Sequence, residues 1–164
     1  MTVKQKSVFW SIVVPCYNES NRVGNIVKIL QFLHGLDKPW ELIVVDDGST
    51  DDTLDKLKSL KKKSDFRLIS YRNNHGKGYA VKTGMLAAVG KFSLFMDIDL
   101  STPISEIKTF SQFVDQYDIV IGTRKVRGAR VVVHQPILRE YLGVVFTLLS
   151  QLILNTKVSD FTCG

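Results

Sequence analysis

The sequence predicts an α/β protein built on a mostly parallel central sheet with helices on both faces. Segments of strand length alternate along the chain with segments whose apolar residues recur at helical spacing. The strand-length segments are apolar throughout, which is typical of strands covered on both faces. A chain of 164 residues is long enough to form one domain with a substantial core.

Strands and helices are predicted in strict alternation. The predicted strands are residues 8–15, 41–45, 66–71, 92–96 and 118–122, and the predicted helices are residues 23–33, 54–60, 79–89, 104–114 and 137–154. Ser20 or Asn21 is expected to cap the first helix and Ser49 or Thr50 the second, because small polar residues are favoured at helix N-termini. Gly35 is expected to end the first helix. The third helix carries small residues that allow close packing on the sheet, namely Ala80, Gly84, Ala87 and Ala88.

The composition argues against several classes of protein. A hydrophobic content of 45% and a charged content of 23% are ordinary for a globular protein. The net charge of +6 suits an anionic partner, but Lys and Arg are dispersed except at residues 61–63 and 124–130, so nucleic acid is not expected. The two cysteines give neither a disulfide framework nor zinc-ligand spacing, and a reduced, cytoplasmic setting is expected. Neither a signal peptide nor an apolar run of the ~20 residues that span a bilayer is visible.

Polar side chains follow four of the predicted strands. They are Tyr17 and Glu19 after the first strand, Asp46 and Asp47 after the second, Asp97 and Asp99 after the fourth, and Arg124 after the fifth. Ligands of open parallel sheets bind at the carboxyl ends of the strands. We therefore expect these side chains to meet at one edge of the sheet and to form a binding site there.

The pair Asp97 and Asp99 predicts a metal site. Residues two apart in a strand lie on the same face, so both carboxylates can turn toward one point. Hard oxygen ligands of this kind suit Mg²⁺ or Mn²⁺, which also keep waters and bind phosphates. Ser101 is expected to add a hydroxyl or to hold a metal-bound water. The alternative is a solvated turn before a helix that starts at Pro103.

A nucleoside diphosphate would use all of these groups. The ring of Tyr17 can cover a base, and Asp46 or Glu19 can accept a hydrogen bond from a base or a ribose hydroxyl. A metal ion would bridge the diphosphate, and Arg124 would give it a planar two-point contact. The glycines of residues 76–78 form neither a Rossmann dinucleotide fingerprint nor a P-loop, so those two kinds of site are not expected.

Five motifs, taken in order, resemble glycosyltransferase family 2. They are Val13-Val14-Pro15-Cys16-Tyr17-Asn18-Glu19, Val44-Val45-Asp46-Asp47-Gly48-Ser49-Thr50-Asp51, Asn74-His75-Gly76-Lys77-Gly78, Met96-Asp97-Ile98-Asp99-Leu100-Ser101-Thr102-Pro103 and Gly122-Thr123-Arg124. Within the family the chain is most similar to the dolichyl- or polyprenyl-phosphate sugar synthases. Residues 160–164 resemble the Asp-x-x-Cys-Gly segment of the dolichyl-phosphate glucosyltransferases.

The resemblance implies a GT-A fold and inverting transfer of a hexose, with Mg²⁺ or Mn²⁺, from a nucleotide sugar of the UDP-glucose or GDP-mannose type to a polyprenyl or dolichyl phosphate. The implied nucleotide-binding residues are Pro15, Tyr17, Glu19, Asp46, Asp47, Lys77, Asp97 and Ile98. The implied metal ligands are Asp97, Asp99 and Ser101. The implied catalytic residues are Asp97, Asp99 and Arg124, of which Arg124 faces the phosphates. The implied contacts to the acceptor phosphate are Arg127, Arg130 and Arg139.

The resemblance also implies one catalytic domain over residues 1–164, with a nucleotide-sugar half at 1–103 and an acceptor half at 104–164. Relatives continue beyond Gly164, so the chain is expected to be truncated and its acceptor half incomplete. A peripheral position at the cytosolic membrane face is expected, and the helix at 137–154 is a candidate for core, membrane or homo-oligomer contacts. Two alternatives stay open: a family member with a glycan or polysaccharide acceptor, and a truncated, non-catalytic nucleotide-binding module.

Overall fold

The fold is seen in a computed structural model that describes residues 7–123, 137–155 and 158. The chain divides into two compact units, Met1–Gln112 and Phe113–Gly164. The first unit holds a sheet of four strands: β1 (Trp10–Cys16), β2 (Trp40–Asp46), β3 (Arg67–Ser70) and β4 (Phe92–Phe95). The strand order is β3-β2-β1-β4 and every neighbouring pair is parallel, so the predicted parallel sheet is confirmed.

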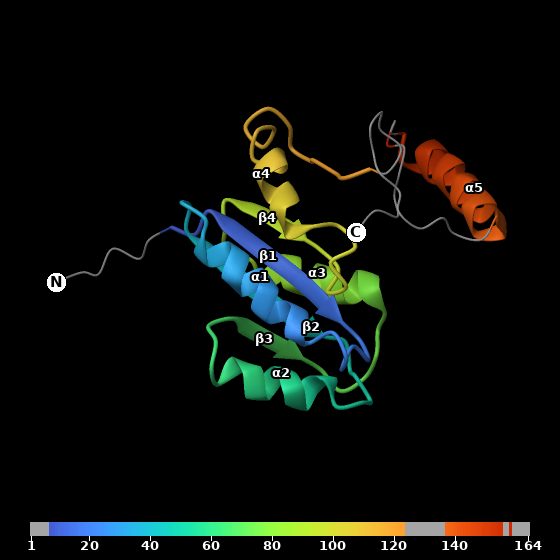
Figure 1. Cartoon of the computed structure of the whole chain (residues 1–164). Coiled ribbons are helices and arrows are strands. Elements are labelled where there is room, and N and C mark those ends of the chain that lie inside the picture. The colour runs from blue at the N-terminus through green and yellow to red at the C-terminus, as the bar shows by residue number, and fades with distance from the viewer. Residues whose placement is uncertain (1–6, 124–136, 156–157, 159–164) are drawn as a thin grey trace. The chain divides into compact units, whose positions relative to one another are not determined.

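Helices cover both faces of this sheet, as predicted. The helices of the first unit are α1 (Gly24–His34), α2 (Thr53–Lys61), α3 (Lys77–Ala87), a 3₁₀ turn η1 (Ile104–Glu106) and α4 (Ile107–Phe110). Figure 1 shows α1 and α3 on opposite faces of the central strands. Because the strands are parallel, each connection must return across a face of the sheet, and the carboxyl ends of all four strands reach the same edge.

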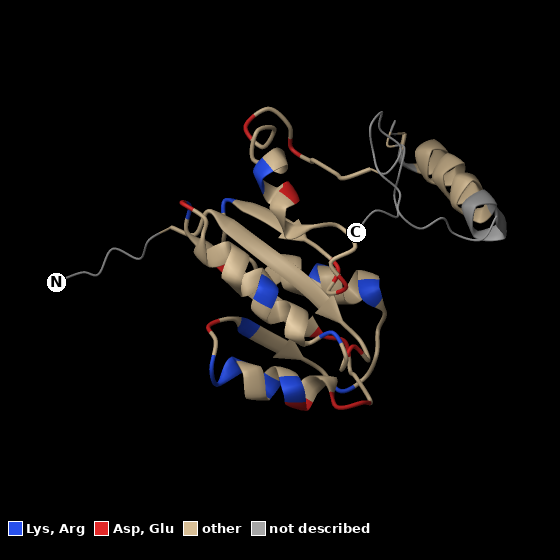
Figure 2. Cartoon of the chain, in the orientation of Figure 1, with Lys and Arg blue, Asp and Glu red and all other residues tan. Residues whose placement is uncertain are grey.

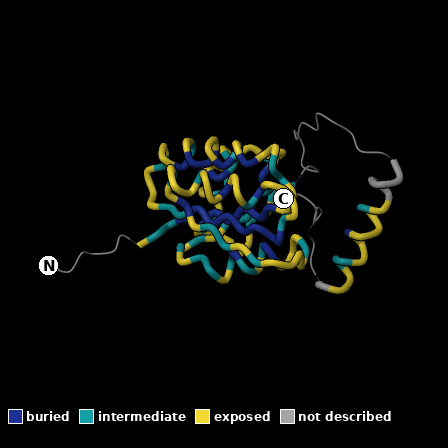
Figure 3. Tube along the Cα trace, turned by 90° about the horizontal axis from the view of Figure 1, so that it is seen from below, coloured by how far each residue is buried: buried dark blue, intermediate teal, exposed yellow. Residues whose placement is uncertain are grey.

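The core lies along the two central strands. Every residue of β1 is buried, and residues 42–46 of β2 are buried as well (Figure 3). On one face, Val13 and Val45 pack against Ala80 of α3. Gly84 lies one helical turn further on, where a Cβ atom would contact Val13 and would meet Val45 Cγ2 at 3.1 Å. The predicted close packing of the third helix on the sheet is therefore confirmed.

Both predicted N-caps are wrong. The residue that precedes α1 is Val23 and the one that precedes α2 is Asp52, and neither makes a side-chain capping hydrogen bond. The two hydroxyl side chains expected to cap α2, those of Ser49 and Thr50, hydrogen-bond to Asn18 instead. Gly35 ends α1 as predicted.

Two elements predicted near the start of the second half differ from the structure. Residues 118–122 do not form a strand, because no other described segment pairs with them and a strand needs a hydrogen-bonded neighbour. Ile119 is accordingly 81% exposed. The helix predicted over 104–114 is limited to η1 and α4, and turns follow it up to residue 116.

The second unit contains α5 (Ile137–Leu154), as predicted from the apolar stretch. Its side chains are described for residues 142–153, and many apolar ones are exposed, among them Leu142, Leu148, Leu152 and Ile153. Within the part of the chain that the structure describes, no helix has both the length and the apolar character that crossing a bilayer requires.

The close contact between α3 and the sheet predicts the effect of adding one methyl group. We expect Gly84→Ala to lower the free energy of unfolding by about 1–3 kcal/mol, because the new Cβ overlaps Val13 in a filled core. The matched control is Gly78→Ala in the same helix, where a Cβ meets nothing within 4 Å. Urea denaturation of both variants measures the difference, and equal stabilities would contradict the packing described.

Candidate functional site

A pocket of about 390 Å³ opens where β1, β2 and β4 end. Its lining comes from the end of β1, from the segments that follow β1, β2 and β4, from the loop before α3 and from the first turn of α3: Pro15, Cys16, Tyr17, Glu19, Asp47, Asn74, Gly76, Lys77, Ala80, Asp97, Ile98 and Asp99. Figure 2 shows acidic residues in the loops at this edge of the sheet. The pocket therefore combines carboxylates, one lysine and the ring of Tyr17, which is 45% exposed.

The buried carboxylate of Asp47 holds the loop before α3. Its Oδ2 accepts hydrogen bonds from Asn74 Nδ2 at 2.9 Å and from the Gly76 N–H at 2.8 Å, and its Oδ1 accepts one from the His75 N–H at 3.0 Å. Asp47 is only 2% exposed. Burial and the charge of Asp47 raise the pKa of the Tyr71 hydroxyl, which belongs to the same loop region. Asp47 therefore acts as an anchor for backbone groups at the edge of the pocket.

Gly48 brings the two loops still closer together. Its φ of +68° lies in the left-handed region, which residues with a Cβ atom rarely adopt. A Cβ at this position would lie 2.6 Å from the carbonyl carbon of Asn73 and 2.8 Å from the nitrogen of Asn74. Glycine is therefore required where the loop after β2 passes the loop before α3.

Lys77 and Asp97 form an ion pair inside the pocket. Lys77 Nζ lies 2.7 Å from Asp97 Oδ1 and donates a hydrogen bond of 2.9 Å to Oδ2. Lys77 is the first residue of α3, directly after the segment that Asp47 anchors. The anchored loop thus delivers an ammonium group to the carboxylate that follows β4.

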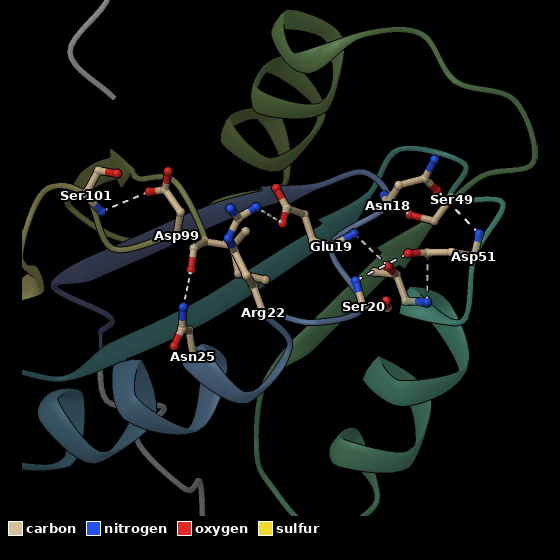
Figure 4. Close-up of polar contacts among 11 residues, drawn as sticks. Asn18, Glu19, Ser20, Arg22, Asn25, Ser49, Asp51, Asp99 and Ser101 are labelled. Atoms are coloured by element: carbon tan, nitrogen blue, oxygen red, sulfur yellow. Dashed lines mark hydrogen bonds and ion pairs between the residues drawn. The ribbon is translucent and has the colours of Figure 1, made fainter. Parts of the chain in front are cut away.

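The turn that carries Asp99 is held by α1. Asn25 Nδ2 donates a hydrogen bond of 2.9 Å to the carbonyl oxygen of Ile98, and Asp99 Oδ1 accepts one from the Ser101 N–H at 2.9 Å (Figure 4). Arg22 donates to Glu19 Oε2 at 2.6 Å. The hydrogen bond and charge of Glu19, with a smaller effect of Asp99, raise the pKa of Arg22. A cationic side chain therefore lies beside both acidic loops.

Asn18 fastens the loop after β1 to the loop before α2. Its Oδ1 accepts hydrogen bonds from the N–H groups of Thr50 at 2.9 Å and Asp51 at 3.4 Å, and its own N–H donates to Ser49 Oγ at 3.0 Å. The Glu19 N–H donates to Thr53 Oγ1 at 2.8 Å. Figure 4 shows Asn18 beside Ser49 and Asp51. These hydrogen bonds hold the backbone at residues 18 and 19, next to the pocket-lining side chains of Tyr17 and Glu19.

Two further groups at this edge of the sheet, Asp46 and Cys16, are buried, and of the two only Cys16 belongs to the pocket lining. Asp46 is fully buried and does not line the pocket, its Oδ2 accepts from the Ser49 N–H at 3.4 Å, and no described residue is a hydrogen-bond partner of its Oδ1. Burial, followed by the charges of Asp46 and Glu19, raises the pKa of the Cys16 thiol. The raised pKa disfavours the thiolate, which is the nucleophilic form of Cys16.

The structure brings most of the predicted donor-side residues together. Those that line the pocket are Pro15, Tyr17, Glu19, Asp47, Lys77, Asp97, Ile98 and Asp99, whereas Asp46 and Ser101 do not. Arg124, Arg127 and Arg130 lie outside the described residues, as does the side chain of Arg139 in α5. Sequence reasoning gave no role to Asn74 and Gly76, although both belong to the Asn-His-Gly-Lys-Gly motif quoted for the resemblance.

The described residues contain no cluster of side-chain metal ligands that is complete on its own. No group of three or more His, Cys, Asp or Glu within residues 7–123 and 137–155 is arranged to hold a metal ion. Asp97 and Asp99 nevertheless line the same pocket and offer hard oxygen atoms. This donor set fits an ion that takes its other ligands from water and from a bound diphosphate.

Comparison with known proteins identifies the family. A family model described as Glycosyl transferase family 2 matches residues 11–164. The chain belongs to this family. The resemblance that the five motifs predicted is therefore confirmed, and the matched region contains every residue of the pocket.

Family 2 relatives with curated functions match along nearly the whole chain. A dolichyl-phosphate beta-glucosyltransferase of Trichomonas vaginalis is 32% identical over 96% of this chain and 50% of the relative, and one of Saccharomyces cerevisiae is 28% identical over 97% and 54%. An undecaprenyl-phosphate 4-deoxy-4-formamido-L-arabinose transferase of Pectobacterium atrosepticum is 28% identical over 93% and 46%. The chain spans about half the length of these relatives.

A solved structure supports the fold prediction. The structure of S. aureus TarS 1-349 in complex with UDP-GlcNAc is 29% identical, with a TM-score of 0.53, over 68% of this chain and 32% of that chain. The predicted GT-A type of α/β fold is confirmed by this match and by the parallel sheet.

The anchor at Asp47 predicts a local and a global effect of its removal. We expect Asp47→Ala to speed hydrogen exchange of the His75 and Gly76 amides and to lower the free energy of unfolding by about 1–3 kcal/mol, because their shared acceptor is lost. The control is Asp55→Ala, whose side chain is 85% exposed on α2. Unchanged exchange at residues 75 and 76 would show that other groups hold the loop.

Proposed function

We propose that this chain is the donor-binding part of an inverting hexosyltransferase that moves a sugar, glucose from UDP-glucose by preference, to a polyprenyl or dolichyl phosphate. The observation that carries the proposal is that Tyr17, Lys77, Asp97 and Asp99 line one pocket at the carboxyl edge of the sheet. Membership of family 2 and the lipid-phosphate sugar transferases among its relatives support the reaction class.

The donor's nucleoside is assigned to the side of the pocket built on β1 and β2. The half-exposed ring of Tyr17 offers a face for the base, and Glu19 offers a carboxylate to the base or ribose. Asp47 supports this side through the loop that it anchors, and Pro15 and Ile98 complete the walls. Asp46 is proposed to support nucleoside binding from the buried layer behind the pocket, where its Oδ1 has no hydrogen-bond partner among the described residues.

The diphosphate is assigned to the side that carries Asp97 and Asp99. Mg²⁺ or Mn²⁺ held by these carboxylates would offset the charge that develops on the leaving nucleoside diphosphate. Ser101 is assigned a supporting place at this ion, since its N–H already orients Asp99. Arg124 would face the same phosphates through a planar, two-point contact.

The acceptor side follows from the chemistry of a lipid phosphate. A phosphate monoester is already anionic near neutral pH, so its oxygen attacks the sugar carbon without a strong general base, and the enzyme mainly aligns the reactants. Arg127, Arg130 and Arg139 are proposed to bind this phosphate. In this proposal residues 1–103 form the nucleotide half and residues 104–164 belong to the acceptor half.

The exposed apolar side chains of α5 suit a peripheral place at a membrane surface, the cytosolic face in this proposal, or a contact between two copies of the chain.

A second candidate function is a nucleotide-binding module without transferase activity. The observation that favours it is that the chain spans about half of each curated relative.

The metal-site assignment predicts a catalytic defect. We expect Asp97→Asn and Asp99→Asn each to lower kcat/KM for transfer from UDP-glucose to a polyprenyl phosphate by about 100-fold or more, because charge on the leaving group is no longer offset. Asp55→Asn on α2, which removes the same charge outside the pocket lining, is the control. Calorimetry with UDP, GDP and Mn²⁺ accompanies the assay. Nucleotide binding without turnover would favour the non-catalytic module, and full activity of both pocket variants would overturn the metal site.

A further inference from the structure

The carboxylate assigned to the metal already carries a cation that belongs to the protein. Lys77 Nζ contacts both oxygens of Asp97, at 2.7 Å and 2.9 Å. The two side chains are 55% and 32% exposed and both line the pocket. An ammonium group thus takes up the coordinating oxygens of Asp97, and a metal ion has to replace it there.

The position of Lys77 is imposed by its surroundings and not by a preference of the helix. Lys77 opens α3, where the helix dipole disfavours positive charge, and the first turn of α3 holds no acidic residue. The hydrogen bonds of Asp47 to the N–H groups of His75 and Gly76 fix the backbone just before it. Asp97 is the partner that offsets this unfavourable placement.

Asp99 is arranged differently, which limits the exchange to one carboxylate. Its Oδ1 accepts the Ser101 N–H, a neutral donor that holds the carboxylate in place, and the charge of Asp99 also acts on the nearby guanidinium of Arg22. The guanidinium of Arg22 is paired with Glu19. Asp99 therefore offers an oriented ligand, whereas Asp97 becomes available only when Lys77 leaves it.

We propose that Lys77 is a built-in counter-ion that competes with the divalent metal for Asp97 and moves to the diphosphate when the donor binds. The inference rests on the proposed function, because it takes Asp97 as a metal ligand. Metal alone must displace an ammonium group, whereas metal together with a diphosphate gives that ammonium a new anionic partner. Metal and nucleotide therefore strengthen each other's binding, and by linkage the effect is the same in both directions.

The first test measures Mn²⁺ binding without nucleotide by electron paramagnetic resonance of the free ion. We expect Lys77→Met to bind Mn²⁺ about three- to tenfold more tightly than the wild-type chain. The substitution removes the partly exposed ion pair that Mn²⁺ must break and the positive charge that repels the ion, and together these have an effect on affinity of this size. Lys82→Met is the matched control, because it removes the same charge from an exposed position of α3 outside the pocket lining. Lys77→Arg keeps the charge and should keep the wild-type affinity.

The second test repeats the titrations with saturating UDP. In the wild-type chain UDP should raise the affinity for Mn²⁺ by a larger factor than in Lys77→Met. The reason is that only the wild-type chain has an ammonium group that can move from Asp97 to the diphosphate of UDP. Thermal unfolding of each variant checks that it is folded. A smaller UDP effect in the wild type than in Lys77→Met would overturn the proposal.

The outcomes separate this inference from the function on which it rests. If the wild-type chain binds Mn²⁺, Asp97→Asn weakens that binding, and Lys77→Met leaves it unchanged, the metal site stands and the competition by Lys77 is overturned. If the wild-type chain binds no Mn²⁺ with or without UDP, the metal site and the inference fail together. Tighter binding by Lys77→Met and not by Lys82→Met is the result that supports the proposal.

Discussion

The carboxylate of Asp47 joins the end of β2 to the start of α3, and the remaining geometry of the pocket depends on this junction. One buried side chain accepts hydrogen bonds from Asn74, His75 and Gly76 and so fixes a loop whose own residues are largely exposed. A charged acceptor makes stronger hydrogen bonds than a neutral one, and burial keeps water from competing for it. The start of α3, and with it Lys77, is placed accordingly.

The parallel sheet supplies the second constraint, because it brings loops that are distant in sequence to one edge. Asn18 ties the loop after β1 to the loop before α2, and Asn25 ties α1 to the turn after β4. These contacts join side-chain amides to backbone groups, so their geometry does not depend on ionic strength in the way that exposed ion pairs do. The hydrogen bonds of Asn18 and Asn25 thus hold the loops around the pocket without charged groups, whereas the pocket lining itself contains charged side chains.

The sequence was sufficient to predict the parts of the structure that depend on local pattern. Uninterrupted apolar runs predicted β1 and β2, and the polar residues just after them predicted the pocket edge. The strand at 118–122 was wrong because strand formation depends on a pairing partner, which no local pattern reveals. Asp46 and Asp47 could not be distinguished by composition, yet neighbouring residues face opposite ways, and only Asp47 reaches the pocket.

The ion pair between Lys77 and Asp97 was beyond sequence reasoning for a related reason, since it joins residues twenty positions apart through the path of α3 and β4. The N-caps failed because Ser49 and Thr50 serve a tertiary contact with Asn18 in place of a local one. Tertiary competition for the same hydroxyl groups overrides the helix-capping preference.

The tight passage at Gly48 also bears on how such a pocket can diversify. No side chain fits between this residue and the backbone of Asn73 and Asn74, whereas a Cβ at Gly76 or Gly78 would meet nothing within 4 Å. Gly76 still keeps a positive φ, so of these positions Gly78 alone combines free space with ordinary backbone geometry. The first turn of α3 can therefore accept a side chain at Gly78 without displacing the backbone that passes Gly48.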